Sequence, residues 1–141
     1  MRRFLLGAVL LAGCSAPGPR IEVRDAYAYQ PVLGDVGAAY FTVVNRGSAP
    51  DTLTVVEVGG ALVAMIHEQV NEGGQDVMRH VGALAVPADS TVSLRPGGLH
   101  LMIEGFQRAP VAGDTLQITL HFARAGAVSV RAPVVAYGTE P

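Results

Sequence analysis

Along most of the chain, apolar and polar residues alternate in short runs separated by glycine, proline and asparagine. This period of two is typical of β-strands that bury one face. In the segment 115–122 every second residue is apolar, and the segment 52–58 repeats the pattern with Leu53 and Val55 on its apolar face. After the first 14 residues no segment keeps a helical apolar period over three turns. The pattern predicts nine strands, over residues 21–29, 38–45, 52–58, 62–70, 76–83, 91–95, 99–104, 115–122 and 127–136.

Nine short strands without helices predict an all-β Greek-key sandwich or barrel. The chain has 141 residues, which suits one domain that buries its own core. Half of the residues are hydrophobic, so a disordered chain is not expected.

The N-terminus has the features of an export signal. Arg2 and Arg3 precede the apolar run 5–11, which is far shorter than the roughly 20 residues that span a bilayer. Small residues then lead to Cys14, and the tetrapeptide 11–14 (LAGC) resembles a bacterial lipobox. We therefore predict a lipoprotein signal peptide at 1–13, a lipidated tether at 14–20 and a folded domain at 21–137, exported to the periplasm and anchored to the membrane through Cys14. The alternative is an ordinary signal peptide with an incidental cysteine.

Composition excludes several classes of function. The formal net charge is −2, whereas nucleic-acid binding needs a basic surface. Cys14 is the single cysteine, so neither an internal disulfide nor a blue-copper thiolate ligand is available to the domain. The sequence contains no carboxylate pair, Ser-His-Asp arrangement or phosphate-binding loop that would indicate an enzyme.

Four soft donor residues stand in one regular spacing. His67 is followed by ten residues and Met78, and twenty-one further residues lead to His100, with Met102 one residue beyond. A hairpin centred between Glu72 and Gly73 would make His67 and Met78 direct cross-strand partners, with Cβ atoms about 4.5–5.5 Å apart.

His100 and Met102 are two residues apart on a predicted strand, so they share one face while Leu101 points to the core. Two imidazoles and two thioethers form a soft, neutral set that favours Cu(I), whereas zinc, calcium and magnesium prefer other donors. Only the imidazoles compete with protons, so Cu(I) affinity is expected to weaken as the pH falls through their titration range. A constant affinity between about pH 5 and 8 would contradict this expectation.

The other histidines and methionines of the domain are less suitable as metal ligands. Met65 and His80 each lie two residues from a candidate ligand and share its face, so each is either packing or an auxiliary donor during metal transfer. His121 lies opposite Phe122 on its strand and is expected to face solvent.

The donor spacing resembles that of the periplasmic copper chaperone family PCu(A)C, whose signature it matches at every interval. Further similar segments are 38–45, 86–88, 96–102 and 113–114, so that the resemblance covers roughly residues 20 to 136. It implies a cupredoxin-like Greek-key β-sandwich that binds Cu(I) through His67, Met78, His100 and Met102. It also implies delivery of that copper to cytochrome c oxidase, especially the copper site of its second subunit.

We expect one high-affinity Cu(I) per domain, because neither the tether nor the tail 136–141 contains histidine or methionine. The copper acceptor would be cytochrome c oxidase subunit II or another copper chaperone. Two other functions stay open at this point. One is a periplasmic copper storage or resistance protein, and the other is a non-metal-binding β-sandwich lipoprotein in which the donors only pack.

Overall fold

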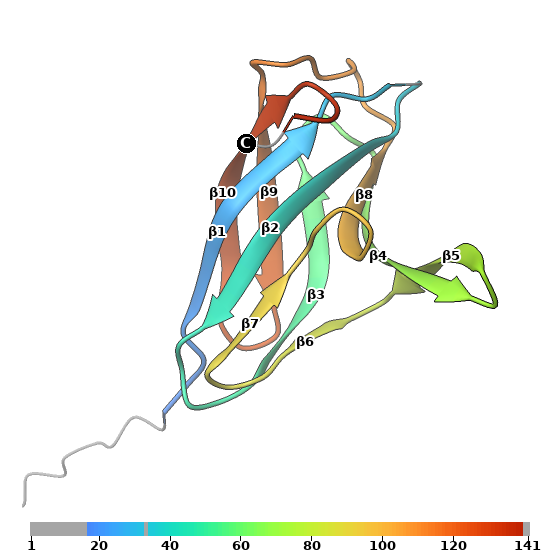
Figure 1. The fold of residues 1–141 in the computed structure, drawn as a ribbon. Coiled ribbons are helices and arrows are strands. Elements are labelled where there is room, and N and C mark those ends of the chain that lie inside the picture. The colour runs from blue at the N-terminus through green and yellow to red at the C-terminus, as the bar shows by residue number, and fades with distance from the viewer. Residues whose placement is uncertain (1–16, 33, 140–141) are drawn as a thin grey trace, which may run out of the picture.

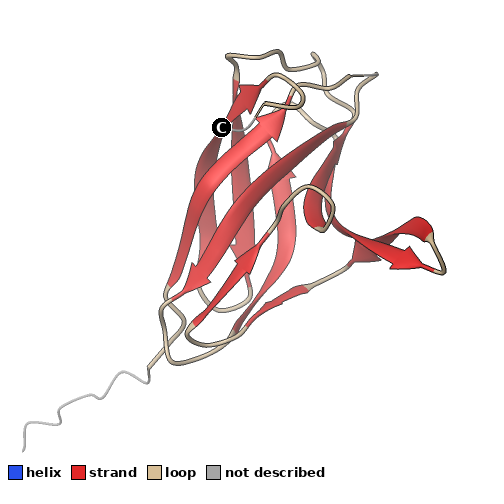
Figure 2. Cartoon of the chain, viewed as in Figure 1, coloured by secondary structure: helices blue, strands red, loops and turns tan. Residues whose placement is uncertain are grey.

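The computed structural model describes residues 17–32 and 34–139, and every regular element in these ranges is a strand (Figures 1 and 2). The predicted signal peptide and Cys14 lie outside the described residues. Within the described ranges, no helix has the length and apolarity to cross a membrane. The ten strands are β1 Ile21–Tyr29, β2 Gly37–Asn45, β3 Asp51–Val58, β4 Val63–Glu72, β5 Gln75–Val81, β6 Leu84–Val86, β7 Ser90–Ser93, β8 Leu99–Glu104, β9 Thr115–Phe122 and β10 Gly126–Val135.

The strands form one sheet, in the order β5-β4-β8-β2-β1-β10-β9-β3-β6, and β7 also pairs with β2. The sheet folds over, so that β1 and β2 lie in front of β9 and β3 in Figure 1. Its two halves join through the parallel pairing of β1 with β10, where Tyr29 is opposite Val135. The predicted all-β class is confirmed, and the additional strand is β6, which has three residues and is too short to show an alternating pattern.

The core lies between the two layers. On β9 the predicted alternation holds, because Ile118 and Leu120 are fully buried from solvent. On β3 it fails after Leu53, which is 2% exposed, whereas Val55 is 52% exposed. The pairing of β3 with β9 shifts register between these two residues. Such a bulge places one extra residue in the strand and reverses which residues face the core.

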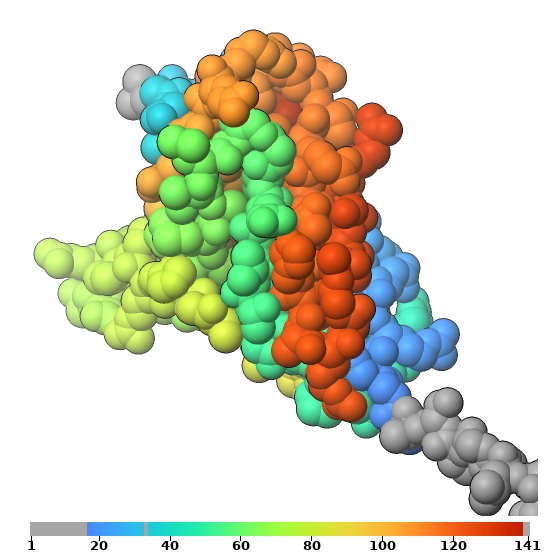
Figure 3. Space-filling view, turned by 180° about the vertical axis from the view of Figure 1, so that it is seen from behind, coloured from blue at the N-terminus to red at the C-terminus, as the bar shows by residue number. Residues whose placement is uncertain are grey.

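The hairpin of β4 and β5 projects from the body of the molecule (Figures 1 and 3). Its turn is Gly73-Gly74, with φ of 62° and 88°, and Glu72 pairs with Gln75. A two-residue turn with positive φ at both positions favours glycine at both, which centres the hairpin one residue later than we expected.

This turn makes the predicted pairing of His67 with Met78 wrong. His67 is opposite His80, and Met78 is opposite Gln69. Moving the centre by one residue moves each partner by two, and side chains two apart on a strand share a face. His67 and Met78 therefore remain on the same face of the hairpin as diagonal neighbours.

Replacing Gly74 by valine is expected to loosen β5 without unfolding the body of the sheet. A β-branched residue at this φ costs about 1–2 kcal/mol, whereas glycine has no such penalty. The amide protons of β5 should then exchange roughly 5- to 30-fold faster with solvent water. The control is Gly73→Asn, because asparagine tolerates the left-handed region. Equal exchange in the valine variant and the wild type would contradict the proposed role of the turn.

Candidate metal centre

The candidate donors lie on three adjacent strands, β5, β4 and β8. In the pairing of β4 with β8, His67 is opposite His100, and Met65 is opposite Met102. On its other edge β8 pairs with β2, where Ala38 is opposite Met102. β8 is thus held on both sides, and the alternation along it buries Leu101 completely, as predicted, between His100 and Met102.

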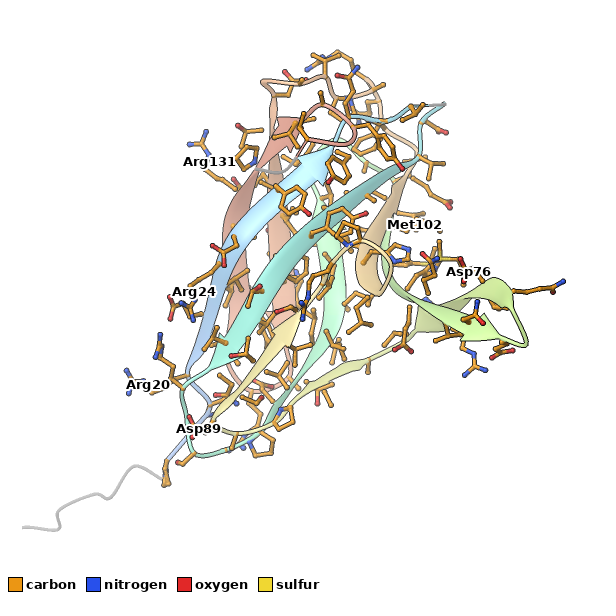
Figure 4. The ribbon with its side chains drawn as sticks, viewed as in Figure 1. Arg20, Arg24, Asp76, Asp89, Met102 and Arg131 are labelled. Atoms are coloured by element: carbon orange, nitrogen blue, oxygen red, sulfur yellow. The ribbon has the colours of Figure 1, made fainter. Side chains whose placement is uncertain are left out.

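Three of the four predicted donors line one cavity of about 370 Å³, namely Met78, His100 and Met102. Figure 4 shows Met102 where the β4–β5 hairpin leaves the body of the sheet, with Asp76 farther out on the hairpin. His67 is not in the cavity lining, but the centroid of its ring is 6.0 Å from that of His100. The structure therefore brings three donors to one cavity and places the fourth beside them.

The His100 side chain is oriented by a hydrogen bond to the main chain. Its Nδ1 lies 3.0 Å from the carbonyl oxygen of Gly98. A carbonyl oxygen only accepts, so the proton of the neutral ring must be on Nδ1, and Nε2 keeps its lone pair. Metal-binding histidines are commonly held in this way by a second hydrogen bond. His100 is also 7% exposed, so its ring has little freedom to turn away.

The Nδ1 atom of His67 is buried and has no hydrogen-bond partner among the residues that the structure describes. Leaving such a group unpaired costs about 1–3 kcal/mol, which a bound metal ion would offset. Burial lowers the pKa of His67, and the neighbouring His100 and His80 lower it further. A lowered pKa favours the neutral imidazole, which is the form that binds a metal.

Tyrosines form much of the remaining cavity wall, and our reading of the sequence missed them. Tyr29, Tyr40 and Tyr137 all line the cavity. The ring of Tyr29 lies 5.6 Å from that of Tyr40 and 5.4 Å from that of Tyr137. Burial raises the pKa of the Tyr40 hydroxyl. The three residues lie on β1, on β2 and after the end of β10, and no local pattern connects them.

The remaining candidates do not line this cavity. His121 is on β9 and pairs with Glu57 at 3.0 Å, with 39% of its side chain exposed. Met65 and His80 line a different cavity, on the side of the hairpin that faces β3. In residues 17–32 and 34–139, no three or more histidine, cysteine, aspartate or glutamate side chains are grouped so as to hold a metal ion.

Comparisons with known proteins identify the family of this chain. The model of the family described as "Putative lipoprotein LpqE-like" matches residues 21–134. The chain is 30% identical over 128 residues to "Putative lipoprotein Lxx21020" of Leifsonia xyli subsp. xyli, covering 89% of this chain and 77% of that protein.

Two solved structures share the fold. One is the copper-bound PCuAC domain from PmoF2, with 26% identity and a TM-score of 0.71, covering 86% of this chain and 96% of that one. The other is the solution structure of CuI-DR1885 from Deinococcus radiodurans, with 30% identity and a TM-score of 0.65, covering 80% and 76%. PCuAC domains have a cupredoxin-like fold, so the predicted fold class is confirmed at this level as well.

Proposed function

Because this chain belongs to the LpqE-like family, of PCuAC type, we propose that it is a Cu(I)-binding metallochaperone that delivers copper to the copper site of cytochrome c oxidase. In this proposal His67, Met78, His100 and Met102 hold one Cu(I), and Cys14 carries a lipid that anchors the protein outside the cytoplasm. The copper named in the two similar structures supports the choice of metal.

The observation that carries the proposal is that each of the two imidazoles has a ring nitrogen available to bind a metal ion. His67 has a buried nitrogen without a partner, and His100 keeps a lone pair on Nε2 beside the cavity. Met78 and Met102 contribute two thioethers to the lining of the cavity that His100 also lines. Two neutral nitrogens and two thioether sulfurs match the preference of Cu(I) for soft ligands.

Unequal exposure of the donors suits release of the ion to a partner. Met78 lies on the projecting hairpin and is 57% exposed, whereas His100 is almost fully buried. A partner's ligand would replace Met78 first, because that side chain is accessible and a thioether binds weakly. The ion would remain on the deeper donors until the partner completes its own site, so that free copper is not released.

Copper binding is tested by anaerobic titration of the purified chain with Cu(I) in competition with a chromophoric chelator. We expect one tightly bound equivalent per chain, since three of the four proposed donors line one cavity and the ring of His67 lies beside that of His100. Met78→Leu preserves volume and removes only the sulfur, so the affinity should fall about 10-fold or more without a change of fold. Two tight equivalents, or an unaltered affinity of the Met78→Leu protein, would refute the assignment.

Delivery is tested in cells that lack the protein. Under low copper, we expect reduced cytochrome c oxidase activity, and restoration by the wild-type gene but not by one encoding both His100→Ala and Met102→Leu. Unchanged oxidase activity together with increased sensitivity to excess copper would favour storage instead. A Cys14→Ala variant separates anchoring from binding, because it should be released from the membrane and keep its Cu(I) affinity.

A further inference from the structure

Three imidazoles lie in one row across β5, β4 and β8. His67 is in the middle, opposite His80 on one side and His100 on the other. The ring centroids are 5.7 Å apart for His67 and His80, and 6.0 Å apart for His67 and His100. Of these three imidazoles, only His67 and His100 are among the four proposed ligands, so His80 has no role in the proposed site.

His80 opens to a second cavity of about 270 Å³, which Met65 also lines. The wall opposite these two side chains comes from residues 53–56 of β3. Gly82 also lines this cavity, beside the imidazole of His80. An imidazole and a thioether therefore share this second cavity, which has no acidic residue in its lining.

His80 is available to bind a metal ion. It is exposed, and its ring makes no hydrogen bond within residues 17–32 and 34–139, where its one ring contact is with His67. Met65 is partly buried and opposite Met102, a proposed ligand, in the pairing of β4 with β8. One nitrogen and one sulfur donor match the chemistry of Cu(I), and a neutral imidazole and a thioether release no proton when they bind it.

We propose that His80 and Met65 form a second, weaker Cu(I) position beside His67, in the cavity that β3 also lines, which an ion occupies as it enters or leaves the main site. His67 is shared between the two positions, so the ion moves by exchange of ligands around it. The copper stays Cu(I) throughout, and no covalent bond of the protein forms or breaks. This inference rests on the proposed function, because the second position has a role only if the first binds copper.

The test is an anaerobic titration of the full chain with up to two equivalents of Cu(I), followed by NMR signals of the histidine rings and methionine methyl groups. The first equivalent should shift the signals of His67, His100 and the two methionines of the main site. The second should shift those of Met65 and His80, with an affinity at least about 100-fold weaker.

The paired variant is Met65→Leu with His80→Gln, which keeps the size of both side chains. It should bind the first equivalent as the wild type does, lose the second, and load from a Cu(I)–chelator complex at least about 10-fold more slowly. His121→Gln is the matched control, since it alters a histidine on β9 away from both cavities. An equal unfolding midpoint of the variants excludes a loss of fold.

The outcomes separate the two proposals. If the first equivalent shifts the four main-site residues but the second leaves Met65 and His80 unchanged, or if the paired variant loads at the wild-type rate, the second position is refuted and the main site stands. If the first equivalent leaves the four main-site residues unchanged, the proposed function itself is refuted, and the second position with it.

Discussion

Replacing Met102 by leucine is expected to weaken Cu(I) binding about 100-fold or more. Loss of a residue that only hydrogen-bonds to a metal ligand already lowers metal affinity about 10- to 100-fold, and here a ligand itself is lost. Met102 is partly buried on a strand that is paired on both edges, so its thioether is held in place beside His100 at the cavity. Leucine keeps the volume and costs less than about 1.5 kcal/mol of stability. The measurement is competition for Cu(I) with a chelator of known affinity, under anaerobic conditions.

His100→Ala should have an effect of similar size, since it removes the imidazole that the Gly98 carbonyl orients. The matched control is His121→Ala, which removes an imidazole from β9 and should leave the affinity unchanged. Thermal unfolding of each copper-free variant shows whether the fold is kept. If the Met102→Leu and His100→Ala proteins are folded and bind Cu(I) as the wild type does, these residues are not ligands.

The second large effect is expected in the stability of the fold, at Asn45. This side chain is 1% exposed at the end of β2 and joins several chain segments. Its Oδ1 accepts hydrogen bonds from the backbone N–H groups of Arg20 and Gly47, and its Nδ2 donates to three carbonyl oxygens, those of Ala49, Val86 and Pro87. Removing it leaves buried backbone groups without partners, at about 1–3 kcal/mol for each fully buried group.

Asn45→Ala should therefore lower the free energy of unfolding by about 3 kcal/mol or more, a large part of the 5–15 kcal/mol typical of a domain. The measurement is the denaturant midpoint, with the slope of the transition checked for two-state behaviour. Asn71→Ala is the control, because that asparagine makes its hydrogen bonds in the exposed hairpin turn. Its loss should cost about 1 kcal/mol or less. Similar costs for the two variants would contradict a special role of Asn45.

Much of the fold followed from local patterns. The alternation in residues 115–122 predicted β9 and its buried face. The glycines at 73 and 74 indicated a hairpin between β4 and β5, but we expected its centre one residue too early, and the pairing that we predicted was wrong. The same method failed where the pattern was too short or interrupted. β6 has only three residues, and the bulge after Leu53 reversed the faces of β3. A bulge depends on the partner strand, which is distant in the sequence, so local periodicity does not reveal it.

The sequence by itself determined which soft side chains the domain contains, two histidines and two methionines at a regular spacing, and from these it predicted a site for Cu(I). Only the tertiary structure decided how these donors meet. It paired His67 with His80 and His100, brought Met78 and Met102 to one cavity, and left a buried nitrogen of His67 without a partner. The physical reason is that β4 and β8 are joined by a non-local pairing whose register the whole sheet sets, whereas residue type is a local property.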